Sequence, residues 1–164
     1  MDPGDPDGFG RWYFYDAALV CLDGMVRLAN RYASLVEKMA NDEVQPERKQ
    51  ELVKIAEACR RVPAKPAKSF HEALQSAWFI ILGVWMESPF VLNCPLGRFT
   101  QYMYPFYRKD RDEGKLTDEE AIELIQFFFL KLNGLAQVLP PHGFAWSQSR
   151  LGLHLCLGGL TASG

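Results

Sequence analysis

The sequence lacks the cysteine pairs, the excess of basic residues and the long apolar runs that mark several classes of protein. Its four cysteines (Cys21, Cys59, Cys94 and Cys156) include no CxxC pair, so neither a zinc site nor a redox dithiol is expected. The formal net charge of −2 gives no basic footprint for nucleic acid. No apolar run reaches the roughly 18 residues that a membrane span needs, and the first ten residues lack the regions of a signal peptide. These absences favour a cytoplasmic protein that binds neither nucleic acid nor membrane.

Apolar residues that recur every three or four positions predict a mainly α fold with about five helices. The expected ranges are 13–40, 46–61, 70–87, 98–112 and 118–132. The lead at 1–11 is rich in Gly, Pro and Asp and is expected to be flexible. The first helix is expected to bury one apolar stripe, made of Phe14, Ala18, Cys21, Leu22, Met25, Leu28, Ala29, Tyr32, Leu35, Val36 and Met39.

Two helix starts carry the same capping signal. Ser69 and Thr117 are each followed three residues later by a glutamate, Glu72 and Glu120. In such a box the hydroxyl accepts from a free backbone N–H of the first turn, and the carboxylate reaches back to the capping residue. Helices are therefore predicted to begin directly after Ser69 and Thr117.

A short apolar run at 151–157, closed by Gly158 and Gly159, predicts one terminal strand. A lone strand cannot satisfy its own backbone donors and acceptors. The strand therefore implies a sheet whose other strands come from residues outside this sequence.

Four sequence pieces in a fixed order carry a family resemblance. They are EALQ (72–75) followed by Trp78 and Phe79, then Glu87, then GRFTQYMYPFY (97–107), and LTDEEAIELI (116–125). Together they resemble the pyruvate formate-lyase-like family of glycyl radical enzymes, over an internal part of such an enzyme. The resemblance implies that residues 12–164 are a partial domain, the helical outer layer and an early strand of a ten-stranded α/β barrel.

The resemblance also implies a chemistry. Family members use a glycyl radical, installed by a radical S-adenosylmethionine activase, and a cysteine that becomes a thiyl radical, to cleave C–C or C–X bonds of small organic substrates as lyases, dehydratases or decarboxylases. Neither the glycine loop nor the cysteine loop has a match here. No catalytic residue, metal ligand or bound cofactor is therefore assigned, and the chain is expected to be inactive alone. Its expected partners are the remainder of the enzyme, the activase and the substrate, with the parent enzyme a homodimer.

The loop between Glu87 and Gly97 is where the family approaches its substrate. The candidate substrate-binding residues are Ser88, Phe90, Asn93 and Cys94 in this loop and His154 on the strand. Glu87, Arg98, Gln101 and Tyr102 match the structural motif, with a Glu87–Arg98 ion pair expected. Apolar residues stand where relatives carry polar ones, which favours an apolar or aromatic substrate over a polyol, unless these residues only pack against the barrel. Thr100 replaces the usual aspartate and is interpreted as structural.

Two other functions remain open. The chain could be a non-catalytic helical module, or a split subunit that completes a partner's barrel. It could also be a freestanding helical bundle with a small-molecule pocket, in which case the strand at 151–157 would be unpaired or absent.

Overall fold

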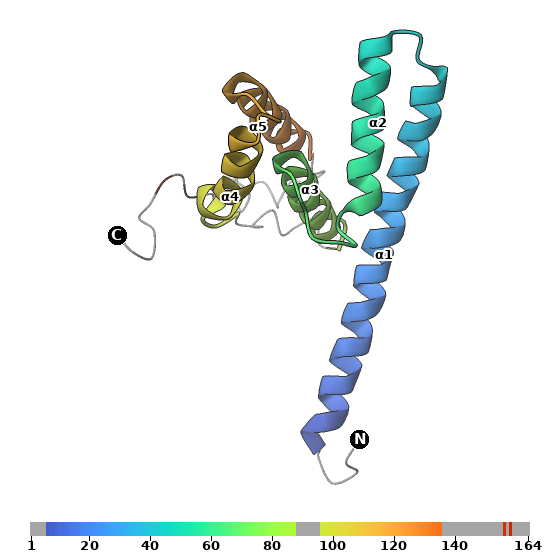
Figure 1. Cartoon of the computed structure of the whole chain (residues 1–164). Helices are drawn as coiled ribbons and strands as arrows, with labels where there is room; N and C mark the ends of the chain where they lie inside the picture. The colour runs from blue at the N-terminus through green and yellow to red at the C-terminus, as the bar shows by residue number, and fades with distance from the viewer. Residues whose placement is uncertain (1–5, 88–95, 136–155, 157, 159–164) are drawn as a thin grey trace, which may run out of the picture. The chain divides into compact units, whose positions relative to one another are not determined.

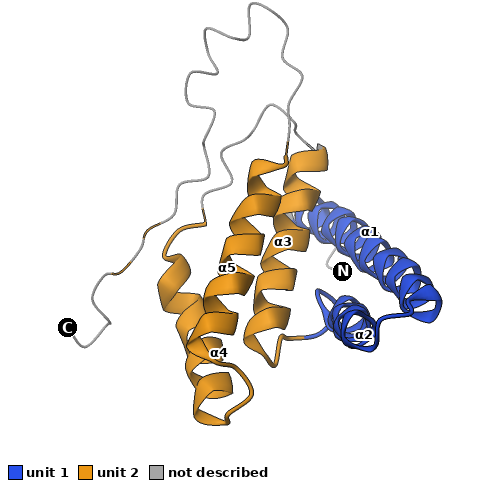
Figure 2. Cartoon of the chain, turned by 90° about the horizontal axis from the view of Figure 1, so that it is seen from above, with its two compact units in different colours: residues 1–65 blue, residues 66–164 orange. Residues whose placement is uncertain are grey.

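Five α-helices account for most of the residues that the structure describes, as the sequence predicts (Figure 1). The structure is a computed structural model that describes residues 6–87, 96–135, 156 and 158. The helices are α1 (Pro6–Asp42), α2 (Pro46–Arg61), α3 (Phe70–Glu87), α4 (Phe99–Asp112) and α5 (Asp118–Asn133). They belong to two units, Met1–Lys65 and Pro66–Gly164 (Figure 2). None of the described helices combines the length and the apolar character required to cross a bilayer.

In the first unit, α1 and α2 form an antiparallel hairpin that packs through small residues. Ala29, Ala33 and Ala40 are buried along one side of α1, at intervals that keep them on one helix face. The buried residues of α2 are Leu52, Ala56, Ala58 and Cys59. Most of these buried side chains are small, so the two helix backbones can approach each other closely and still fill the space between them.

The predicted apolar stripe of α1 is mostly wrong, because only Ala29 among its members is buried. Phe14, Cys21, Leu22, Tyr32, Leu35 and Met39 are exposed. For Phe14, Cys21 and Leu22 the reason is length: at 1.5 Å per residue, α1 extends for about 55 Å and α2 for about 24 Å. Within this unit α2 therefore covers only the C-terminal part of α1. Tyr32, Leu35 and Met39 lie in that C-terminal part, but there Ala29, Ala33 and Ala40 are the buried residues.

The N-terminal half of α1 is rich in exposed aromatic residues. Phe9, Trp12, Tyr13, Phe14 and Tyr15 are each 48–69% exposed. Helix α1 begins at Pro6, so residues 6–11 are helical where a flexible lead is predicted. Proline suits a first helical position because its missing N–H would have no partner there, and Phe9 and Tyr13, one turn apart, stack edge to face at 4.7 Å.

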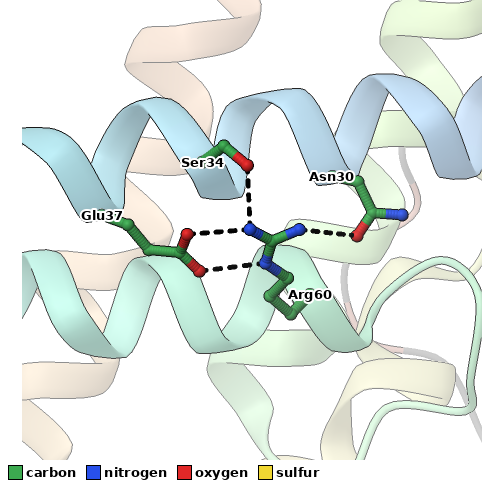
Figure 3. A network of polar contacts seen from close by, with 4 residues as sticks. All are labelled: Asn30, Ser34, Glu37 and Arg60. Carbon is green, nitrogen blue, oxygen red and sulfur yellow. Dashed lines mark hydrogen bonds and ion pairs between the residues drawn. The ribbon is translucent and has the colours of Figure 1, made fainter.

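A polar network joins the two helices on the surface of the hairpin (Figure 3). The Arg60 guanidinium on α2 donates from Nε and Nη2 to the two carboxylate oxygens of Glu37 on α1, at 2.9 and 2.8 Å. It also donates to Ser34 Oγ at 2.8 Å and to Asn30 Oδ1 at 3.4 Å. The hydrogen bond from Arg60 lowers the pKa of Glu37. Such forked pairing fixes the rotation of one helix against the other.

In the second unit, α3 packs against α4 and α5 (Figure 2). The buried core of this unit consists of Phe70, Ala73, Leu74, Ile81, Leu96, Phe99, Met103, Ala121, Phe128 and Leu132. All three helices contribute to it, together with Leu96, which lies three residues before α4. Ile80, Met86, Ile122, Phe127 and Leu130 on α3 and α5 are exposed, so each of these helices keeps an apolar face that the described residues leave uncovered.

Both predicted capping signals are present at the helix starts. At α5, Thr117 Oγ1 accepts from the Glu120 N–H at 3.1 Å, and Glu120 Oε2 accepts from the Thr117 N–H at 2.8 Å. At α3, Ser69 Oγ accepts from the Glu72 N–H at 3.2 Å, whereas the Glu72 carboxylate accepts from the N–H of Lys68, one residue before the cap, at 2.6 Å. The α3 signal is thus a shifted version of the α5 box.

A buried carboxylate provides a further cap for α3. Asp110 is only 5% exposed, and its Oδ2 accepts from the Phe70 N–H at 2.7 Å. Lys109 Nζ donates to the Lys68 carbonyl beside it at 3.1 Å. The C-terminal end of α4 therefore holds the start of α3, across 40 residues of sequence.

The predicted terminal strand is not seen. Of residues 151–157 only Cys156 is described, and it is not part of a strand. Its N–H donates to the Gly97 carbonyl at 2.7 Å. A single backbone contact of this kind does not make a sheet, and the other residues of the run lie outside the described part of the chain.

We expect Arg60→Gln to destabilise the hairpin at pH 7 and to matter less in acid. Because the pKa of Glu37 is lowered on folding, its pairing stabilises the folded state above the ordinary carboxyl pKa of 4.5 and is lost as pH falls through the lowered value. The difference in urea midpoint between wild type and variant, followed by circular dichroism, should therefore shrink below pH 4.5. Arg48→Gln is the control, since Arg48 pairs with Glu51 within α2 and links no helices. A difference that is equal at pH 7 and pH 3 would contradict the assignment.

We expect Asp110→Ala to lower the free energy of unfolding by about 1–3 kcal/mol, because the Phe70 N–H would lose its buried acceptor. Asp110→Asn keeps an acceptor oxygen and should cost less. Asp112→Ala, which removes an exposed carboxylate of the same helix, should stay within about 0.5 kcal/mol. Urea unfolding of the three variants measures the difference, and equal losses for Asp110→Ala and Asp112→Ala would refute the capping role.

Candidate functional site

The turn at residues 96–102, which opens α4, carries most of the predicted structural motif. Gly97 has a φ of +58°, a left-handed conformation that glycine adopts without a steric penalty. Leu96 and Phe99 on either side of it are buried, and Phe99 stacks on Phe128 of α5 with ring centroids 5.6 Å apart. These two apolar anchors fix the turn to the core of the second unit.

The motif side chains bond within this turn. The Tyr102 hydroxyl donates to the Leu96 carbonyl at 2.8 Å, closing the turn from the helix side. Arg98 is the residue before α4, and its Nη1 donates to Gln101 Oε1 at 3.5 Å. The predicted Arg98–Glu87 pair involves a side chain outside the described residues and stays a prediction. The three described motif residues therefore shape the turn itself.

The turn also binds two residues from the far end of the chain. The Gly97 carbonyl accepts from the Cys156 N–H at 2.7 Å. Thr100 Oγ1 accepts from the Gly158 N–H at 3.1 Å and donates to the Gly158 carbonyl at 3.4 Å. Thr100 thus uses its hydroxyl to hold backbone, which supports its interpretation as structural.

The candidate substrate-binding residues cannot be placed against this turn. Ser88, Phe90, Asn93, Cys94 and His154 all lie outside the described residues, and their role stays a prediction. Sequence reasoning missed the contacts of Gly97 and Gly158, although a glycine just before the start of a helix and a Gly-Gly pair after an apolar run are both signals of special backbone conformation.

Resolved pKa shifts in the second unit lie nearer the C-terminal end of α4. The Tyr107 hydroxyl donates to Asp118 Oδ1 at 2.8 Å, and this bond is the main reason that the pKa of Tyr107 is raised. Arg111 pairs with the same carboxylate at 2.8 Å. Hydrogen bonding to Lys115 lowers the pKa of Glu113. Each group is engaged by a neighbour in the turn that joins α4 to α5, so these shifts reflect structural pairing.

The turn is therefore suited to holding backbone and not to acid–base chemistry. The neutral hydrogen bonds described above join a threonine hydroxyl, a tyrosine hydroxyl and backbone N–H groups to hydroxyl and carbonyl acceptors, and Arg98 donates to the Gln101 amide oxygen. Such contacts position a segment of chain with high geometric precision.

Comparison with known proteins places this arrangement in a family. The family model described as pyruvate formate lyase-like matches residues 1–164. Isethionate sulfite-lyase of Oleidesulfovibrio alaskensis is 37% identical over 153 residues, which are 90% of this chain and 18% of that protein. Indoleacetate decarboxylase of Tractidigestivibacter scatoligenes is 32% identical over 149 residues, covering 90% of this chain and 17% of that protein.

A solved structure gives the same result. A protein from Roseburia inulinivorans, described in connection with 1,2-propanediol dehydration, superposes with a TM-score of 0.78 at 45% identity. The match covers 81% of this chain and 17% of that one. The chain thus spans less than a fifth of the length of these relatives. Sequence motifs, family model and helical superposition agree, and the chain belongs to the pyruvate formate lyase-like family.

Proposed function

We propose that this chain is part of a glycyl radical enzyme that cleaves a C–C or C–X bond of a small organic substrate, and that it is inactive alone. In this proposal its helices are outer-layer elements of a ten-stranded α/β barrel, most of which lies in the remainder of the enzyme. The partners are that remainder, a radical S-adenosylmethionine activase and the substrate, in a cytoplasmic homodimer.

The observation that carries the proposal is that the match covers nearly all of this chain but only a small share of each relative. The similarity takes in 90% of this chain but only 18% of isethionate sulfite-lyase. Relatives of the chain are named for sulfite release, decarboxylation and dehydration. One stretch shared by enzymes of such different names is best explained as framework, with the reaction decided elsewhere in the enzyme.

The described glycines support inactivity of the isolated chain. A glycyl radical requires a sheltered backbone position, away from solvent and close to a thiol. Each described glycine is exposed or half-buried: Gly8, Gly10, Gly24, Gly83, Gly97, Gly114, Gly134 and Gly158. Of the described cysteines, Cys21 and Cys156 are exposed, and only Cys59 is buried, in the α1–α2 hairpin.

For the substrate, we propose a small apolar or aromatic molecule contacted by Ser88, Phe90, Asn93, Cys94 and His154. The support comes from the apolar residues at 89–92, since a polyol requires polar side chains placed for its hydroxyl groups. The relative that acts on indoleacetate shows that the family accepts aromatic substrates.

A second candidate function is a non-catalytic or split subunit that docks on a partner and completes its barrel. The exposed aromatic residues of α1 and the exposed apolar faces of α3 and α5 favour it, because apolar surface of this extent marks an interface. Both candidates require the rest of a barrel and differ in whether it continues on the same polypeptide.

We expect no glycyl radical when the chain alone is incubated anaerobically with S-adenosylmethionine, a cognate activase and a one-electron reductant such as dithionite. Electron paramagnetic resonance should show a silent spectrum, because no described glycine is sheltered. Adding a polypeptide that supplies the remainder of the enzyme should produce the glycine-type doublet.

A complete family member with its own activase is the positive control for the reagents. A doublet from this chain alone would overturn the proposal. A doublet with the added polypeptide, followed by turnover of substrate, would support it and would also show that the two pieces can act as separate subunits.

A further inference from the structure

The first turn of α4 contacts residues that follow it by more than fifty positions. One carbonyl and one hydroxyl group make the contact. The Gly97 carbonyl accepts from the Cys156 N–H, and the Thr100 hydroxyl accepts from the N–H of Gly158 and donates to its C=O. We propose that this turn is a docking site for the backbone at residues 156 and 158, and that Thr100 is the positioning residue that fixes Gly158 against α4.

The hydroxyl of threonine suits this task because it both donates and accepts. Donating to the Gly158 carbonyl and accepting from its N–H, it satisfies both polar groups of one peptide residue. A carboxylate at position 100 could only accept, and a valine could do neither. The contact therefore depends on the identity of the side chain and not only on its size.

The conformation of Gly158 is the second half of the contact. Its φ is +76°, in the left-handed region, and a Cβ built at this position meets nothing within 4 Å. Glycine is therefore required here for its backbone conformation and not for lack of space. The left-handed residue turns both its N–H and its C=O to the same hydroxyl.

The turn that provides the site is itself rigid. Leu96 and Phe99 are buried in the core of the second unit, and the Tyr102 hydroxyl holds the Leu96 carbonyl. The Gly97 carbonyl also accepts from the Phe99 N–H at 2.9 Å, which keeps it aimed along the start of the helix. The site is thus preorganised, so a bond to it costs little ordering.

The functional meaning rests on the proposed function. If the chain is part of a glycyl radical enzyme, the contact with Thr100 fixes the backbone of Gly158 relative to the helical layer to which α4 belongs. Thr100 would then position the backbone of Gly158 without touching substrate.

The test is amide hydrogen exchange at Gly158, measured by NMR on the 164-residue chain with ¹⁵N-labelled glycine and cysteine. Thr100→Val should speed exchange at Gly158 by roughly two- to tenfold, the range expected for one lost hydrogen bond. Thr100→Ser keeps the hydroxyl and should stay within about twofold of wild type. Because residue 100 is remote in sequence, neither variant changes the intrinsic exchange rate of the Gly158 amide.

A merely structural role for Thr100 in α4 would produce a different pattern. It would lower the urea midpoint of Thr100→Val, and exchange at the Gly158 amide would become faster only by as much as global unfolding does. The proposal expects an unchanged midpoint with faster local exchange. Equal Gly158 exchange in all three proteins, or a midpoint that falls together with the protection, would overturn it.

A second variant tests the contact from the other side, should Thr100→Val fail to fold. Gly158→Ala disfavours the left-handed conformation and should raise exchange at the Cys156 amide, which shares the docking site. Gly24→Ala, at an exposed helical position with nothing within 4 Å, is the matched control and should leave it unchanged. Unaltered Cys156 exchange in Gly158→Ala would overturn the proposal. None of these measurements depends on radical formation, so they can succeed or fail independently of the enzymatic assignment.

Discussion

The hydrogen bond from the Phe70 N–H to the buried Asp110 carboxylate is the constraint on which the second unit depends. It ties the first turn of α3 to the last turn of α4, and the Lys109–Lys68 contact reinforces it. With that end fixed, Phe99 at the other end of α4 reaches Phe128 of α5, and the three helices share one core. The same core then anchors the turn at residues 96–102. The Phe70–Asp110 contact at one end of α4 and the apolar anchors Leu96 and Phe99 at the other end together hold the candidate site in place.

Local signals made much of the fold predictable from the sequence. All five helices were predictable because each has its own periodicity, and α3 and α5 begin where Ser69 and Thr117 predict them because a capping box acts within four residues. The face that α1 buries was not predictable. A helix with apolar residues on several sides has no unique stripe, and the choice of Ala29, Ala33 and Ala40 depends on where α2 lies.

In the candidate site, too, the local contacts were predictable from the sequence and the contacts between distant segments were not. Arg98, Gln101 and Tyr102 were found from a contiguous motif, and the hydrogen bonds Arg98–Gln101 and Tyr102–Leu96 lie within that turn. The pairing of Thr100 with Gly158 spans 58 residues, and no local pattern encodes it. Asp110 gave no signal of its role either, since an aspartate near the end of a surface helix is ordinarily solvated. Contacts between distant segments were the part that required a structure.

The unequal lengths of α1 and α2 have a consequence for biosynthesis. The aromatic half of α1 is synthesised before α2, and α2 contacts the other half of α1. Phe9, Trp12 and Phe14 therefore gain no cover when the hairpin closes. Nascent segments that stay apolar and uncovered are the substrates of chaperones. Closing the hairpin therefore leaves the aromatic end of α1 exposed, as an apolar surface that only another segment or chain can cover.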